Sequence, residues 1–164
     1  MKVQKRNGVF ETNSSSVHSL SFAKSGRKKN HIQMNKAGFL VANFGVFSCS
    51  GTFYTQEDKL SYLATCAWYL TGCPTDLEYM YDSYVWGTLE DAAKSYVDGC
   101  KGIRVSGFNR GKDGDEYSYG EDAPYIDHQS VPNYTDDMIV DFYDRDALID
   151  FIWNDYISLK CSRD

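Results

Sequence analysis

The stretch TQEDKLSYLATCAWYLTGCP, residues 55–74, decides the fold because it carries both the start signal and the stop signal of a long helix. Thr55 is placed to cap the helix, and Asp58 lies where a carboxylate meets the positive end of the helix dipole. Gly72 and Pro74 predict where the helix ends. The apolar residues between these signals recur at the spacing of one helical face, and they are Leu60, Leu63, Ala64, Ala67, Trp68 and Leu70.

Two further helices are predicted downstream, so that the middle of the chain is helical. Thr75 indicates the start of a helix that runs to about Trp86, and Thr88 the start of a third helix that ends at Gly99. Close to the end of the chain, another helix is expected with Asp144 or Asp146 as its cap. Its inward-facing residues are predicted to be Leu148, Ile149, Phe151 and Ile152.

Strand signals flank these helices. Asn7-Gly8 is a two-residue turn signal and predicts an N-terminal hairpin. Branched and aromatic residues then predict strands at Ser19–Ala23, His31–Met34, Phe39–Phe47, Gly102–Phe108 and around Ile157 and Leu159. We therefore expect a single compact α+β domain over residues 1–164, mostly antiparallel sheet with a helical middle section.

Composition narrows the class of protein. Hydrophobic residues at 42% and aromatic residues at 15% exclude a disordered chain. The five cysteines are odd in number and form no C-x-x-C pair, which argues against a disulfide framework and a zinc ribbon. The sequence contains no apolar run of the length that a secretory signal or a membrane span needs. These features predict a soluble protein of a reducing cytoplasm, without membrane attachment.

The net charge of −6 conceals two parts of opposite sign. Residues 1–36 hold eight Lys or Arg and one Glu, a net charge of +7, whereas the remainder carries −13. Such a distribution can steer a charged partner, or the basic and acidic parts can simply attract one another. An acidic body is a poor nucleic-acid binder, so no direct nucleic-acid binding is expected. Tyr79, Tyr81 and Tyr84 can stack a base, although this helical spacing is more typical of packing.

Two short segments concentrate polar chemistry, and each contains a histidine. The first contains His18 and the candidate binding residues Thr12, Asn13, Ser14, Ser15 and Ser16, and the second contains Asp127, His128, Gln129 and Ser130. If the segments meet, they form a polar pocket suited to a phosphate or a nucleotide, because neutral donors and an imidazole can bind an anion. The alternative is that each is a turn whose hydroxyl groups cap exposed N–H groups.

Catalysis in such a pocket would use His128 as the base, with His18 or a serine in support and Asp127 to orient the ring. Adjacent residues seldom orient one another, because consecutive side chains on a strand point to opposite faces. His128-Gln129-Ser130 fits the H-x-[ST] pattern of two-histidine phosphoesterases, but His18-Ser19-Leu20 does not. His18, His128 and Asp127 are residue types that bind metal ions. They form no compact ligand motif, so no metal site is predicted. Nothing in the sequence indicates a cofactor.

A resemblance rests on these same segments. The string from Arg6 to Ser19, R-x-G-V-F-E-T-N-S-S-S-x-H-S, and the string Y-I-D-H-Q-S from Tyr125 to Ser130 are similar to a family of small, uncharacterised bacteriophage and prophage proteins. The resemblance covers these two strings and not the middle of the chain. It implies a viral protein in the host cytoplasm, and small phage proteins of this kind often act against a host defence system.

Two functions are therefore predicted as alternatives. In the first, a phage-encoded effector binds a host defence protein or its nucleotide messenger and inhibits the defence system. In the second, a small hydrolase or transferase acts on a phosphate-containing substrate with His128 and His18 in the site. Whether the protein is an enzyme stays open at this point, as do its oligomeric state and any ligand.

Overall fold

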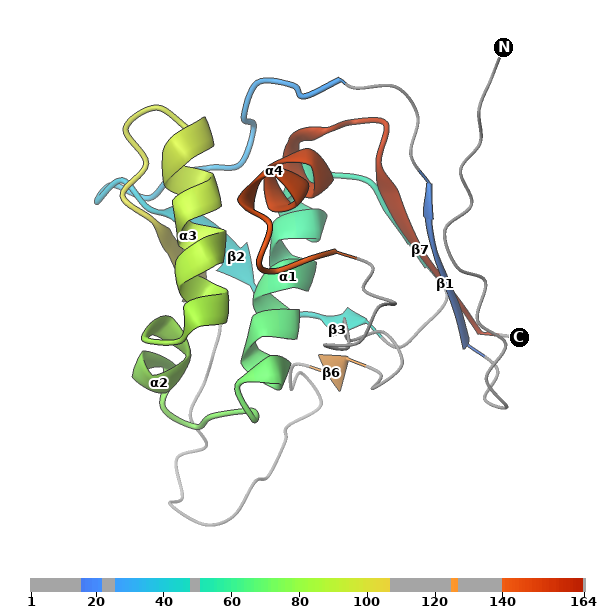
Figure 1. Ribbon diagram of the computed structural model, residues 1–164, viewed down its shortest axis with the longest axis horizontal. Helices are drawn as coiled ribbons and strands as arrows, with labels where there is room; N and C mark the ends of the chain where they lie inside the picture. Colours follow the sequence, from blue (N-terminus) through green and yellow to red (C-terminus); the bar gives the residue numbers. More distant parts are fainter. Residues whose placement is uncertain (1–15, 22–25, 48–50, 107–124, 127–139, 164) are drawn as a thin grey trace.

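The computed structural model describes residues 16–21, 26–47, 51–106, 125–126 and 140–163. Figure 1 shows helices packed together beside short strands, so the α+β class predicted from the sequence is confirmed. In chain order, the elements of the described residues are β1 (Ser16–Ser21), β2 (Leu40–Asn43), β3 (Val46–Phe47), β4 (Gly51–Phe53), α1 (Gln56–Leu70), α2 (Leu77–Tyr81), α3 (Tyr84–Tyr96), β5 (Ile103–Ser106), β6 (Tyr125–Ile126), α4 (Arg145–Trp153) and β7 (Ser158–Arg163). The predicted N-terminal hairpin lies outside these residues.

Helix α1 forms as the sequence predicts. The hydroxyl of Thr55 accepts a hydrogen bond from the backbone N–H of Asp58 at 3.0 Å, which satisfies one of the amides that a helix start leaves unpaired. The helix ends at Leu70, and Gly72 follows with a φ of +84°, a left-handed conformation that glycine adopts without steric cost. Five residues of the predicted apolar face are buried, namely Leu60, Leu63, Ala64, Ala67 and Trp68, and Leu70 is partly buried against the core.

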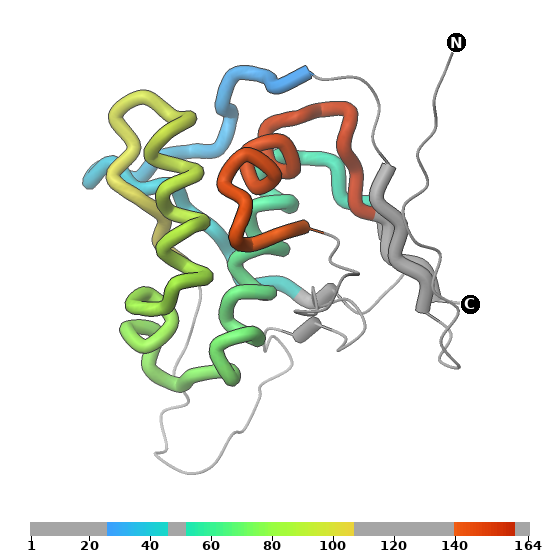
Figure 2. The backbone as a smooth tube through the Cα atoms, in the orientation of Figure 1, coloured from blue at the N-terminus to red at the C-terminus, as the bar shows by residue number. Residues whose placement is uncertain are grey.

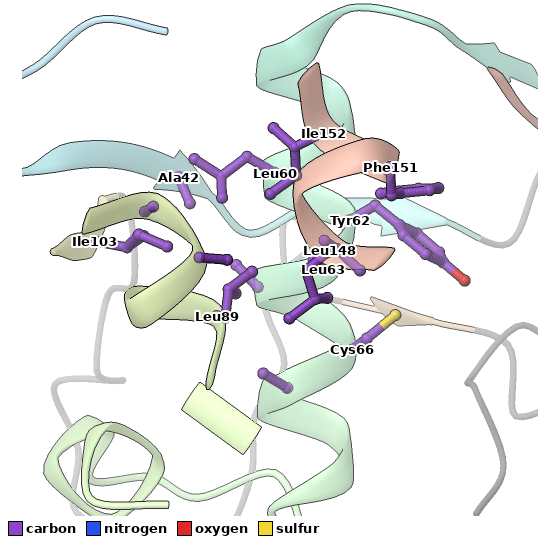
Figure 3. Packing of buried hydrophobic residues seen from close by; sticks show 14 of the residues in the cluster. Ala42, Leu60, Tyr62, Leu63, Cys66, Leu89, Ile103, Leu148, Phe151 and Ile152 are labelled. Atoms are coloured by element: carbon purple, nitrogen blue, oxygen red, sulfur yellow. The ribbon is translucent and has the colours of Figure 1, made fainter. Parts of the chain in front are cut away.

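The core brings α1, α3, α4 and the β2–β5 pair together. Figure 3 shows Leu60 and Leu63 of α1 between side chains of the other three elements. The labelled partners include Leu89 from α3, Leu148 and Ile152 from α4, and Ala42 and Ile103 from β2 and β5. In Figure 1, α1 runs through the middle of the molecule, with α3 on one side and the β1–β7 pair on the other.

The boundary between α2 and α3 differs from the sequence prediction. The break lies at Ser83, whose hydroxyl accepts a hydrogen bond from the N–H of Trp86 at 3.2 Å, and not between Trp86 and Thr88. Thr88 is inside α3, where its hydroxyl donates to the carbonyl of Tyr84 at 3.1 Å. Both residues are good caps, and burial of Trp86 and Leu89 on one face of α3 selects Ser83.

The predicted predominance of antiparallel sheet is wrong for the described residues. One sheet is antiparallel, with the order β1-β7-β4, but β2 pairs with β5 and β3 pairs with β6 in parallel. The chain passes through α1, α2 and α3 between β2 and β5. Such a long helical crossover lets the second strand return in the same direction, which a short hairpin turn cannot do.

Helix α4 and strand β7 confirm the predicted C-terminal elements. Asp144 caps α4, since its side chain accepts hydrogen bonds from the N–H groups of Asp146 at 2.9 Å and Ala147 at 3.1 Å. The predicted inward-facing residues are all buried, as are Ile157 and Leu159 around the start of β7.

Lys59 of α1 is a buried lysine, and it holds α1 to the end of α4. Its Nζ donates hydrogen bonds to the carbonyls of Asn154 at 2.9 Å and Ile157 at 3.3 Å. Burial lowers the pKa of Lys59 to about 8, against the charge of Asp155, which raises it. The link between the two helices therefore depends on a group that titrates at slightly alkaline pH.

The basic N-terminal part contacts the acidic body at Arg27. Its Nε lies 2.6 Å from Oδ1 of Asp150, and its Nη2 lies 3.7 Å from Oδ1 of Asp146. The hydrogen bond to Asp150 raises the pKa of Arg27 further. The backbone carbonyl of Lys28 accepts a hydrogen bond from the hydroxyl of Tyr96 at 3.0 Å. The attraction that the charge distribution predicts is thus present at the outer surface of α4.

Candidate functional site

The polar segments that the sequence singles out lie mostly outside the described residues. This holds for Thr12 to Ser15 and for Asp127, His128, Gln129 and Ser130. Ser16 and His18 belong to β1, where they pair with Arg163 and Cys161 of β7. β6 ends at Ile126, immediately before the second segment. The shared pocket of His18 and His128, and any catalytic role of these residues, therefore stays a prediction.

A groove of about 830 Å³ lies between α3 and the start of α4. This volume is within the range of ligand-binding sites. Figure 2 shows the segment that leads into α4 beside α3. The groove is lined by Tyr84, Gly87, Thr88, Asp91, Lys94, Ser95, Tyr143, Asp144, Arg145 and Asp146.

Two tyrosines form the aromatic part of the groove. The rings of Tyr84 and Tyr143 are stacked, with centroids 5.2 Å apart and planes inclined by 27°. Tyr84 is the first residue of α3, while Tyr143 follows a turn in which its N–H donates to Oδ1 of Asp141 at 2.7 Å. Tyr84 remains 64% exposed and Tyr143 52% exposed. The backbone thus fixes a ring pair whose surface is largely available to a ligand.

Carboxylates outnumber cations in the rest of the lining. The acidic residues of the lining are Asp91, Asp144 and Asp146, of which Asp146 lies 3.7 Å from Nη2 of Arg27, and the basic ones are Lys94 and Arg145. Lys94 already has a carboxylate partner, because its Nζ lies 3.0 Å from Oε2 of Glu90, one turn earlier on α3. The groove therefore has an acidic balance and favours a cationic ligand over an anionic one.

Glu90 connects the groove to strand β5. Its Oε1 accepts hydrogen bonds from the N–H of Ile103 and from Nη1 of Arg104, both at 3.1 Å. Burial acts to raise the pKa of Glu90, but these contacts and the Lys94 ammonium more than offset burial, and the pKa is lowered. The carboxylate is thus held ionised beside the groove, where it stabilises the position of Lys94.

The threonine and serine hydroxyl groups of the lining are engaged within α3. Thr88 donates to the carbonyl of Tyr84, and Ser95 donates to the carbonyl of Ala92 at 2.9 Å. Among the residues that the structure describes, neither histidine nor cysteine lines the groove.

Of these residues, only Tyr84 stood out in the sequence as a possible ligand contact, as one of three tyrosines able to stack on a base, whereas Thr88, Asp144 and Asp146 stood out only as helix caps. Tyr143 did not stand out. The signal that the sequence offered was an aromatic residue directly before the helix cap Asp144.

The described residues contain no group of three His, Cys, Asp or Glu side chains placed to hold a metal ion. Within the described part of the chain, every helix is too short or too polar to cross a bilayer.

No protein family, curated protein or solved structure matches this chain.

Proposed function

We propose that this protein is a non-enzymatic, phage-encoded effector that binds a host protein through the groove between α3 and α4 and thereby inhibits a bacterial defence system. The observation that carries the binding part of the proposal is the exposed Tyr84–Tyr143 pair at the edge of an acidic groove. Exposed tyrosines supply contact area at low entropic cost, and they are enriched in protein interfaces. The resemblance to phage proteins in the two polar strings supports the biological setting.

A protein partner fits the groove better than a nucleotide messenger. The tyrosine pair can stack on a base, but a phosphate would lie among the carboxylates of Asp91, Asp144 and Asp146. One of the two lining cations, Lys94, is already paired with Glu90. A protein segment can instead place its own basic groups against these carboxylates.

The proposal is tested by affinity capture from a bacterial host lysate with the full-length chain. The binding variant replaces Tyr84 and Tyr143 together with alanine. The matched control is Tyr79→Ala, which removes a tyrosine that is 68% exposed on α2 and outside the groove lining. We expect the wild type and the control to retain the same host protein at a fixed molar ratio. The double variant is expected to lose it.

Retention that is unaffected by the double variant would place the interface elsewhere and contradict the proposal. Native mass spectrometry of the purified protein provides the second readout. A nucleotide released on denaturation from the wild type but not from the double variant would favour the messenger over a protein. Circular dichroism of each variant checks that the exposed substitutions leave the fold intact.

A further inference from the structure

Arg104 shows how this protein itself binds a guanidinium group. Its Cζ lies 4.3 Å from the ring centroid of Phe39 and 5.0 Å from that of Tyr81. Its Nη1 lies 3.1 Å from Oε1 of Glu90. Aromatic faces attract a guanidinium through their negative potential, and a carboxylate neutralises its charge. The arrangement forms on a partly exposed surface of the fold.

The groove between α3 and α4 offers the same kinds of group, and its lining also contains Arg145. Tyr84 and Tyr143 supply the rings, and Asp91 and Asp144 supply carboxylates within the same lining. Asp91 is exposed and makes no hydrogen bond or ion pair within the part of the chain that the structure describes. Asp144 accepts two backbone hydrogen bonds through one oxygen, Oδ1.

We propose that the groove binds an arginine side chain from a basic segment of the partner protein, with its guanidinium stacked on the tyrosine pair and its charge met by Asp91 and Asp144. This inference rests on the proposed function, and it specifies the chemistry of the partner. The cavity is larger than one side chain, so it accommodates the flanking residues of the segment as well.

Arginine fits this groove better than lysine. A guanidinium is planar, stacks on aromatic faces and is less strongly hydrated than an ammonium group. Arg145 opposes any cationic ligand, because it lies in the lining as the first residue of α4. Loss of the Asp91 charge should therefore weaken the binding of a cation and strengthen that of an anion. Loss of the Arg145 charge should do the reverse.

Fluorescence anisotropy with labelled peptides tests this difference on the full-length protein. The probe is an arginine-rich peptide on a Gly/Ser backbone, and the comparison peptides carry lysine or glutamate in place of arginine. We expect the arginine peptide to bind about fivefold more tightly than the lysine peptide. Combined replacement of Tyr84 and Tyr143 with alanine should weaken its binding about tenfold.

The isosteric variant Asp91→Asn should weaken binding of the arginine peptide about threefold, and Arg145→Gln should strengthen it by a similar factor. Both positions are exposed, so the variants are expected to keep the thermal transition of the wild type. Stronger binding by Asp91→Asn together with weaker binding by Arg145→Gln, or preference for the glutamate peptide, would overturn the inference in favour of an anionic ligand. Equal affinity for the arginine and lysine peptides with no effect of the tyrosine variant would reduce the binding to general charge attraction and overturn it too.

Failure of this inference is distinguishable from failure of the proposed function. If a host protein is captured through the tyrosine pair but is not displaced by the arginine peptide, the proposed function is supported and the binding of an arginine is contradicted. If the arginine peptide binds the groove but no host protein is captured through it, the binding of an arginine is supported and the effector role is contradicted.

Discussion

Replacement of Lys59 with methionine should abolish a rise of stability at alkaline pH. In the folded protein, burial lowers the pKa of Lys59 to about 8 from its ordinary value of 10.5. Between these two values the unfolded chain holds the proton that the folded protein has lost. The free energy of unfolding of the wild type therefore receives a contribution that increases with pH across this window.

The magnitude follows from the two pKa values. Linkage gives a gain of about 2 kcal/mol in the free energy of unfolding between pH 7 and pH 9.5, and the full shift corresponds to about 3 kcal/mol. Methionine has a similar length and no titrating group, so the Lys59→Met variant lacks this contribution. Tyrosines and other lysines titrate in both proteins, and their effects cancel when the variant is subtracted from the wild type.

Urea denaturation at pH 7, 8.5 and 9.5 measures the difference, with Lys36→Met as a control at an exposed position. The free energy of unfolding of the wild type should rise relative to that of the Lys59→Met variant as the pH rises. The Lys36→Met control should show the same pH dependence as the wild type. A difference between wild type and the Lys59 variant that stays within about 0.5 kcal/mol over this range would refute the reasoning. It would mean that burial does not lower the pKa of Lys59 in solution.

Two further substitutions test the local structure. Gly102 has a φ of +138°, and a Cβ there would lie 2.5 Å from Oε1 of Glu90, so Gly102→Ala should displace the carboxylate from the N–H of Ile103. A loss of about 2 kcal/mol is expected in urea denaturation, and an unchanged midpoint would contradict it. Thr55→Ala should cost about 1 kcal/mol by removing the cap on the Asp58 amide. Thr55→Ser should keep the thermal midpoint, and equal losses in the two variants would argue against the cap.

The structure describes only part of the site that the sequence predicts. The second polar segment, with His128, lies outside the described residues, and His18 is placed only as a strand residue paired with Cys161. Their convergence therefore stays a prediction. The sequence did not predict the groove, because its two tyrosines lie far apart along the chain. The packing of α4 against α3 brings Tyr143 to Tyr84.

The sequence by itself determined helices α1 and α4, together with the buried face of α4 and the apolar stripe of α1. Their signals are local, since Thr55 and Asp144 cap amides two or three residues away and the apolar positions repeat within each helix. Only the tertiary structure decided the parallel pairing of β2 with β5, the burial of Lys59 and the acidic groove. Short strands carry little pattern, and a pairing partner, a desolvated charge and a cavity all depend on residues distant in the chain.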